Sequence, residues 1–429
     1  MPAPVPAPPL APVRQQALTA LFPVVDGHTE ALAQALRASA VAVCARLALA
    51  STLHFARFVP LPAADDAQGH GRASLLFATT FDGELDAHLA ELWDVAGADL
   101  DTFFLHCEGW RSPGSGAQLE RFVRRHLRAA AALFSAQNGL TVQDVQAGAR
   151  LRADVARVLD EHGEKLRALA PLEIVESVRA VLTREVASPG AARLRAGPQA
   201  TMARERPAET ATTGQIVLHQ GLALATTWLR SLLLDLSDAL RALWHAAPKG
   251  GAKREPGQAV PPGAERCFSH VAQLKPGKSR RAALRLALRV LDELTALATA
   301  RGTLAGAQSI HGARWVLLED GRLVLLGDFA DSPFALLGGL AARAGSALSM
   351  LWSHTRRFPL SFGWRFGGAR DEARLRRFAR DGAVETPLWY SAYPELGGRE
   401  IRENAEICRL WAGQLDDAGA RRLLALIKD

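Results

Sequence analysis

The hexapeptide HFARFV at residues 54–59 recurs as HGARWV at residues 311–316. Four of the six positions are identical, and the fifth position keeps an aromatic residue. Further along, residues 75–110 align without gaps on residues 323–358, at a constant offset of 248. The identical pairs in that stretch that are neither Leu nor Ala are Phe81/Phe329, Gly97/Gly345 and His106/His354. An Ala- and Leu-rich composition does not readily produce this order by chance, so the sequence predicts an internal duplication.

Each copy has the same predicted order of elements, strand–helix–strand–strand–helix–strand. In the first copy the predicted strands cover residues 17–24, 53–60, 73–80 and 102–107, and the predicted helices cover residues 28–50 and 84–96. This order is the ferredoxin-like plan, an antiparallel sheet with helices on one face. The other face of such a sheet is apolar, and two copies can bury these faces against each other. We therefore predict an α+β fold of two tandem ferredoxin-like (βαββαβ) units, residues 15–150 and 266–412, packed sheet to sheet as a pseudo-dimeric α/β barrel.

The rest of the chain is predicted to lie outside these units. Residues 1–14 form a Pro- and Ala-rich disordered tail, and residues 413–429 a C-terminal helix. Residues 151–265 hold a helical extension, a linker and an amphipathic helix at 216–245. Charged residues interrupt that helix well before the ~20 apolar residues that a membrane span needs. It therefore either packs on the protein itself or lies in a membrane interface.

Positive charge is concentrated in one part of the chain. The formal net charge is +7, and residues 248–289 alone hold ten basic and two acidic residues. Such a segment attracts anions. We expect an anionic membrane surface or an acidic protein as partner of residues 216–289, with a solvated linker as the alternative. Specific nucleic-acid binding is not expected, because Phe268 is the only aromatic residue in the basic window.

The cysteines and the missing motifs narrow the class of protein. The four cysteines, Cys44, Cys107, Cys267 and Cys408, have the spacing of neither a disulfide framework nor a zinc site. We expect reduced, mostly buried thiols in a cytoplasmic protein, with attachment to a membrane surface as a further possibility for its location. The sequence has no Walker A loop, G-x-S-x-G, H-E-x-x-H or Rossmann glycine motif. Nucleotide-dependent enzymes, serine hydrolases and zinc proteases are therefore disfavoured.

The repeated HFARFV strand, the L-L-F-x-x-x-F-D-G segment at residues 75–83 and the order of elements resemble the dimeric α/β-barrel superfamily. Within it the chain is most similar to bacterial members with no assigned reaction. More distant members include Dyp-type peroxidases, chlorite dismutases and small antibiotic-biosynthesis monooxygenases. The first two bind haem, so the resemblance implies haem as a cofactor. The segment from Thr79 to Gly83 shares only the final D-G of the Dyp-type G-x-x-D-G motif.

Two arginines and four histidines of the repeat are the candidate site residues. Arg57 and Arg314 lie inside apolar strands, where an unpaired buried charge costs several kcal/mol. Each is either a catalytic group that lines a pocket or part of a structural ion pair. The candidate haem ligands are His54, His106, His311 and His354. Their alternative role is that of hydrogen-bonded structural histidines.

The surroundings of these residues predict where a pocket lies. His106 and His354 are expected in a strand or just after it, where Glu108 can orient His106. Phe55 is expected on the same face of its strand as Arg57, whereas Gly312 leaves that space open beside Arg314. The pocket is therefore predicted mainly in the second unit.

Two functions follow as hypotheses. The first is a haem-binding, peroxidase-like or dismutase-like protein, with Arg57 and Arg314 as catalytic residues. The second is a non-catalytic duplicated-barrel scaffold that associates with an anionic membrane surface or partner protein through residues 216–289. The sequence leaves open whether the protein is an enzyme at all.

Overall fold

A computed structural model describes residues 15–63, 72–137, 139–166, 168–186, 266–362 and 366–428. The predicted tail at 1–14 and the predicted amphipathic helix at 216–245 lie outside these residues. The described chain divides into two compact units, one containing the β-sheets and one made of helices. Of the described residues, the sheet unit takes those from 16–137 and 266–397, and the helical unit those from 139–186 and 398–428.

The first half of the sheet unit contains four strands and three helices. In chain order they are β1 (Gln15–Pro23), α1 (Thr29–Leu47), β2 (Leu53–Leu61), β3 (Ser74–Asp82), α2 (Leu85–Phe104), α3 (Gly116–His126) and β4 (Ala132–Ser135). Leu32, Leu36, Val43 and Leu47 are buried along one stripe of α1, as the helical spacing of the sequence predicts. The first three predicted strands and the predicted helix at 28–50 are confirmed to within a few residues.

The second half repeats this order with one addition. Its elements are β5 (Cys267–Gln273), α7 (Lys278–Arg301), β6 (Ile310–Leu317), β7 (Arg322–Phe329), α8 (Pro333–Trp352), β8 (Ser361–Phe362), β9 (Phe366–Gly367), the 3-10 turn η2 (Gly368–Arg370), α9 (Glu372–Asp381) and β10 (Leu388–Ser391). The helices α2 and α8 are kinked at Ala96 and Ala344, which correspond to each other at the offset of 248. The addition is the small β8–β9 hairpin.

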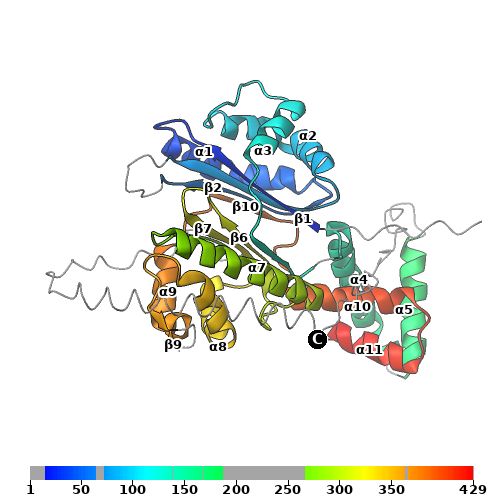
Figure 1. Cartoon of the computed structure of the whole chain (residues 1–429). Helices are drawn as coiled ribbons and strands as arrows, with labels where there is room; N and C mark the ends of the chain where they lie inside the picture. Colours follow the sequence, from blue (N-terminus) through cyan, green and yellow to red (C-terminus); the bar gives the residue numbers. More distant parts are fainter. Residues whose placement is uncertain are drawn as a thin grey trace, which may run out of the picture. The chain divides into compact units, whose positions relative to one another are not determined.

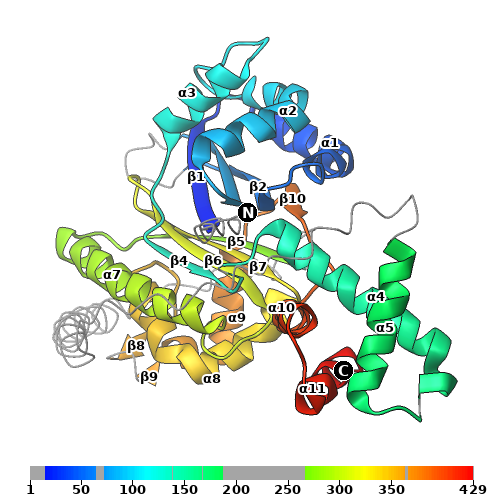
Figure 2. The same ribbon diagram turned by 90° about the vertical axis from the view of Figure 1, so that its right-hand side faces the viewer.

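The two four-stranded sheets exchange their last strands. Their strand orders are β1-β3-β2-β10 and β4-β6-β7-β5, so β10 completes the sheet of the first half and β4 that of the second (Figures 1 and 2). The pairing is antiparallel, with Tyr390 opposite Ala56 and Phe134 opposite Ala313. Tyr390 is buried in the core of the first sheet and Phe134 in that of the second. Neither four-stranded sheet is therefore built entirely from strands of its own half of the chain.

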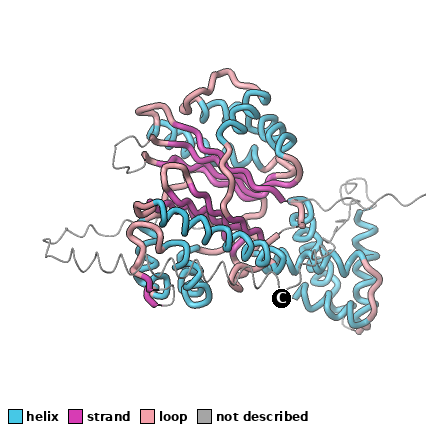
Figure 3. Tube along the Cα trace, in the orientation of Figure 1, coloured by secondary structure: helices cyan, strands magenta, loops and turns pink. Residues whose placement is uncertain are grey.

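The sheets lie face to face, with helices on their outer sides (Figure 3). A small apolar cluster joins the facing surfaces: Val59, Leu61, Leu76 and Ala78 from one sheet, and Val316, Leu318, Val324 and Leu326 from the other. Larger clusters fill the space between each sheet and its own helices. The prediction of an α+β fold in which two sheets bury their apolar faces is confirmed at this level.

The strand predicted at residues 102–107 is wrong. Residues 102–104 are the last turn of α2, and the fourth strand of the first half is β4 instead. The aromatic run TFFLHC is typical of a strand, but Leu92, Ala96, Leu100, Phe103 and Phe104 are buried at helical spacing along α2. The order of elements therefore includes an additional helix, α3, before the fourth strand.

The helical unit joins two distant segments. It contains α4 (Val142–Leu166), α5 (Pro171–Val186), α10 (Gly398–Ala412) and α11 (Asp417–Lys428). Val155, Val158, Ile407 and Leu423 are among the residues of its shared core. The expected domain ends at residues 150 and 412 thus differ from the observed division, because α4 and α10 pack with α5 and α11.

One described helix, α8, meets the length and composition of a membrane span, with a mean hydropathy of 1.4 over its most apolar window. In the structure α8 covers the outer side of the second sheet. The cysteine prediction is confirmed, since all four thiols are free and three are buried.

Candidate functional site

Four of the six predicted site residues meet in the layer between the two sheets. A β-bulge interrupts the pairing of β2 with β3 between Leu53 and Phe55, and another interrupts β6 with β7 between Ile310 and Gly312. The bulged residues are His54 and His311. Bulges redirect a side chain out of the simple alternation of a strand. The rule that alternate residues of a strand share one face therefore does not hold across His54 and His311.

His54 lies in a buried chain of hydrogen bonds. Its Nε2 is 2.9 Å from Oδ1 of Asp82, and its Nδ1 is 2.8 Å from the hydroxyl of Tyr393. The carboxylate accepts from Nε2–H, so in the neutral imidazole Nδ1 accepts the hydroxyl proton. Burial raises the pKa of Tyr393 well above its usual range, so this hydroxyl keeps its proton. Both nitrogens of His54 are engaged.

His311 occupies the corresponding place in the second half. Its Nδ1 is 2.8 Å from Nε2 of Gln137, whose position in the swapped strand region matches that of Tyr393. Burial lowers the pKa of His311 to about 4, against a smaller opposite effect of Asp328 and of the Leu396 backbone. The ring of Phe55 lies 5.7 Å from that of His311. His311 is therefore a neutral, hydrogen-bonded residue.

Arg57 crosses from the first sheet to the second and forms an ion pair with Asp328. Its guanidinium also donates to the carbonyl oxygens of Phe268 and Gly327, at 3.2 and 3.0 Å. The same carboxylate accepts from the indole nitrogen of Trp389 at 2.9 Å. The ion-pair alternative of the sequence analysis thus describes Arg57.

Arg314 crosses in the opposite direction and meets the corresponding atoms of the first sheet. It donates to the carbonyl oxygens of Leu18 and Thr79 and to the hydroxyls of Thr19 and Thr80. Thr80 stands where the second half has Asp328, so none of these four acceptors is charged. Burial lowers the pKa of Arg314 to about 10, although Asp328 opposes this shift. Its Nε has no hydrogen-bond partner among the described residues.

The space expected beside Arg314 borders on the exchanged strand and on Asp328. A Cβ at Gly312 would lie 3.6 Å from the carbonyl oxygen of Phe134 and 3.7 Å from Asp328, which are ordinary contact distances. A pocket at this strand stays a prediction, and the pocket described below lies elsewhere in the second half.

His106 and His354 lie away from the other four residues, in the turns that follow α2 and α8. The backbone carbonyls of these two histidines accept corresponding bonds from Val25 and Lys275, each at 2.9 Å. Nδ1 of His106 is 3.3 Å from Nδ1 of His28. Glu108 forms an ion pair with Arg72 and does not orient His106. The expectation of a strand with Glu108 beside His106 is therefore wrong.

His54 and His311, two of the four candidate haem ligands, already form hydrogen bonds through their rings. Both nitrogens of His54 are taken, and Nδ1 of His311 is held by Gln137. Among the residues that the structure describes, no group of three or more His, Cys, Asp or Glu is placed to hold a metal ion. What the layer between the sheets does is cross-link them through buried polar contacts.

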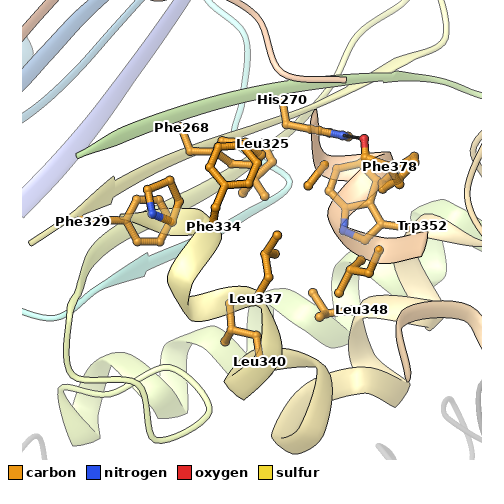
Figure 4. Close-up of a pocket in the computed structure, with 13 residues that line it drawn as sticks. Phe268, His270, Leu325, Phe329, Phe334, Leu337, Leu340, Leu348, Trp352 and Phe378 are labelled. Carbon is orange, nitrogen blue, oxygen red and sulfur yellow. Dashed lines mark hydrogen bonds between the residues drawn. The ribbon is translucent and has the colours of Figure 1, made fainter. Parts of the chain in front are cut away.

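A pocket of a different kind lies on the outer side of the second sheet, under α8 and α9 (Figure 4). Its volume is about 70 Å³. The residues around it are almost all apolar: Phe268, His270, Leu325, Phe329, Pro333, Phe334, Leu337, Leu340, Leu348, Trp352, Leu375, Phe378 and Ala379. Leu337 and Leu340 are only half-buried, so this wall of the pocket faces outward. Concave, mostly apolar sites with few polar groups are typical of small-molecule binding.

Among the residues that line this pocket, His270 alone is titratable. Its Nε2 is 3.2 Å from the carbonyl oxygen of Phe378, so Nε2 carries the hydrogen and Nδ1 is an acceptor (Figure 4). Burial lowers the pKa of His270 to about 4, which keeps the ring neutral near pH 7. His270 is 2% exposed, and its Nδ1 has no hydrogen-bond partner among the described residues. A buried acceptor without a partner is uncommon in folded proteins and calls for a ligand or a water.

The corresponding space in the first half is filled by aromatic rings. Phe22 stacks on Phe122 with ring centroids 4.6 Å apart, and Phe77 lies 6.4 Å from Phe104. In the second half the residues at the positions of Phe22 and Phe77 are Ala272 and Leu325. Of these two residues Leu325 lines the pocket, and its side chain is smaller than that of Phe77.

This pocket beneath α8 was not predicted from the sequence. Its signal was present in the alignment, where Leu325 replaces Phe77 and an unmatched His270 appears in an apolar strand. The residues that point to the pocket are those that differ between the two copies, not those that are identical. Comparison of the chain with family models, with curated proteins and with solved structures found no match.

Proposed function

We propose that the protein binds a small, largely apolar molecule with one hydroxyl group in the pocket beneath α8. Two observations carry the proposal: the apolar cavity, and the buried Nδ1 of His270, a lining residue, which has no hydrogen-bond partner among the described residues. A ligand hydroxyl would donate to this nitrogen while its carbon skeleton contacts the leucine and phenylalanine side chains. This binding function needs no catalysis. In this respect it agrees with the scaffold hypothesis and differs from the oxidoreductase hypothesis.

The size of the pocket limits the ligand. A cavity of about 70 Å³ is below the ~300 Å³ at which pockets for drug-sized ligands begin, and haem belongs to that larger class. A single ring or a short branched chain is the expected size, with room to extend past the half-buried Leu337 and Leu340. Haem binding stays a prediction of the sequence, and the absorption spectrum of the purified protein, with or without a Soret band, would decide it.

We further propose that the two halves are copies of one ferredoxin-like unit, arranged as a pseudo-dimeric barrel with exchanged fourth strands. The matching kinks at Ala96 and Ala344 support this origin. The matching contacts of Arg57 and Arg314 across the sheets support it as well. The pocket would then be a feature that one copy acquired.

Phenol and benzene form a matched pair of probes for the pocket, because they differ by one hydroxyl. We expect phenol to bind saturably and about two- to tenfold more tightly than benzene, as one net hydrogen bond of ~0.5–1.5 kcal/mol implies. His270→Leu keeps an apolar lining and removes the acceptor, so the two probes should then bind equally. Isothermal titration calorimetry or ligand-detected NMR measures both affinities.

A second variant fills the pocket. Leu325→Phe places in the second half the ring that the first half has at Phe77, and should weaken phenol binding about tenfold or more. The matched control, Phe77→Leu, makes the reverse change in the first half and should leave phenol binding unchanged. Equal phenol binding by the wild type and Leu325→Phe, or no saturable binding of phenol, would contradict the proposal.

A further inference from the structure

Among the described residues, the β8–β9 hairpin is present in the second half and has no counterpart in the first. The offset between the halves is 248 up to Phe358, and it is 256 between Phe134 and Tyr390. Eight additional residues thus lie between residues 358 and 390, and the hairpin strands Ser361–Phe362 and Phe366–Gly367 are found there. The backbone nitrogen of Ala369 donates to Oγ of Ser349, which fixes the base of the hairpin to α8. Figures 1 and 2 show β9 beside α8.

The hairpin exposes large apolar side chains. Leu360 is 57% exposed and Phe366 is 73% exposed. Phe362 pairs with Phe366, and the backbone nitrogen of Gly368 donates to the carbonyl of Leu360. Because side chains alternate along a strand, Leu360 and Phe366 lie on the same face of the hairpin. The pair gives this edge of the protein an apolar tip.

Cations gather at the base of this tip. Arg356 and Arg357 are exposed and precede Leu360 by a few residues. The backbone nitrogen of Arg356 donates to Gln273, and that of Lys275 donates to His354. These bonds place Lys275 and the exposed Lys278, which belong to the basic segment, next to the two arginines.

The acidic residues near the hairpin are already paired. Residues 354–382 contain eight arginines and three acidic residues. Asp371, Glu372 and Asp381 form ion pairs with Arg374, Arg376 and Arg377 of α9. Among the described residues, neither Arg356 nor Arg357 has a carboxylate partner within 4.0 Å. The local excess of positive charge therefore faces solvent.

We propose that this edge, made of Leu360, Phe366, Arg356, Arg357 and Lys278, binds an anionic lipid surface. Arginine and lysine near such a surface each contribute attraction, and exposed apolar side chains enter the boundary between headgroups and acyl chains. Leu360 favours lipid over single-stranded nucleic acid, because an aliphatic side chain enters lipid but offers no face on which a base stacks. The site is separate from the pocket, so either proposal can fail alone.

Sedimentation of the full chain with vesicles tests this proposal. We expect binding to vesicles of phosphatidylcholine with phosphatidylglycerol, and none to pure phosphatidylcholine. Arg356→Gln with Arg357→Gln should weaken binding about thirtyfold, as two surface charges at ~1 kcal/mol each imply. Leu360→Ser with Phe366→Ser should weaken it at unchanged net charge.

Matched controls come from the first half. Arg121→Gln with Arg125→Gln removes two exposed arginines of α3, and Val41→Ser with Leu49→Ser removes side chains that are 87% and 73% exposed. Both controls should bind vesicles like the wild type. Equal losses in controls and hairpin variants, or hairpin variants that bind like the wild type, would overturn the proposal. Binding of an oligouridine that the same hairpin variants abolish, without vesicle binding, would overturn it in favour of nucleic acid.

Discussion

Replacing Asp328 with asparagine is expected to destabilise the protein by about 3–5 kcal/mol, the range for breaking a buried ion pair on one side. Asp328 is the carboxylate partner of Arg57 and also the group that opposes the loss of charge at Arg314. Without it, two buried guanidinium groups share a layer with neutral acceptors only. Urea unfolding monitored by circular dichroism measures the change.

The matched control for Asp328 is Thr80→Ala at the corresponding position. It removes a neutral acceptor 3.0 Å from Arg314 and should cost about 1 kcal/mol. Replacing Arg57 and Asp328 together by Leu should cost less than Asp328→Asn alone, because the guanidinium of Arg57 is then removed with its partner and only that of Arg314 stays buried. A cost for Asp328→Asn no larger than that for Thr80→Ala would show that this ion pair does not stabilise the fold.

Acidification from pH 6.5 towards pH 4 is expected to destabilise the protein steeply. Burial lowers the pKa of His270 and His311 to about 4 and that of His88 to about 3, from 6.5. The folded pKa values lie below the unfolded ones, so the unfolded chain takes up protons first as pH falls. The stability is present in full above about pH 6.5 and is lost towards pH 4. With three groups the slope approaches about 4 kcal/mol for each pH unit.

The unfolding free energy at several values of pH between 7 and 5 gives this slope. His311→Gln should lower the slope by about a third, whatever its effect on the stability at pH 7. Carboxylates whose pKa is lowered, such as Glu385, change the unfolding free energy mainly below the pH range of 7 to 5. They therefore contribute little to the slope measured in that range. A stability that stays constant from pH 7 to pH 5 would mean that these histidines are not held neutral by burial.

Much of the sheet unit could be predicted from the repeat, because a copied pattern indicates a copied set of contacts. Arg57 and Arg314 illustrate this, since both cross to the opposite sheet and reach matching atoms. The exchange of β4 and β10 could not be predicted, because a short strand such as LWYS carries no information about which sheet edge it completes. The strand expected at 102–107 was wrong because an aromatic run fits both a strand and the last turn of a buried helix.

The candidate site was harder to predict than the fold. The repeated histidines and arginines attracted attention, yet their partners, such as Tyr393 and Gln137, came from distant strands that local spacing does not connect. Part of the pocket depends on a missing ring, because the second half has Leu325 where the first half has Phe77. A cavity has no sequence motif. It can be found only when the structures of the two copies are compared position by position.

The exchange of strands has a consequence for synthesis on the ribosome. The edge of β2 is completed by β10, and about 330 residues separate them in the chain. At ~5–20 residues per second, roughly 20–60 s pass between the emergence of the two strands. During that time the nascent first sheet keeps an open edge, which is the kind of surface that recruits foreign strands. Slower translation would lengthen this exposure, so the yield of native protein should depend on elongation speed in the second half of the message.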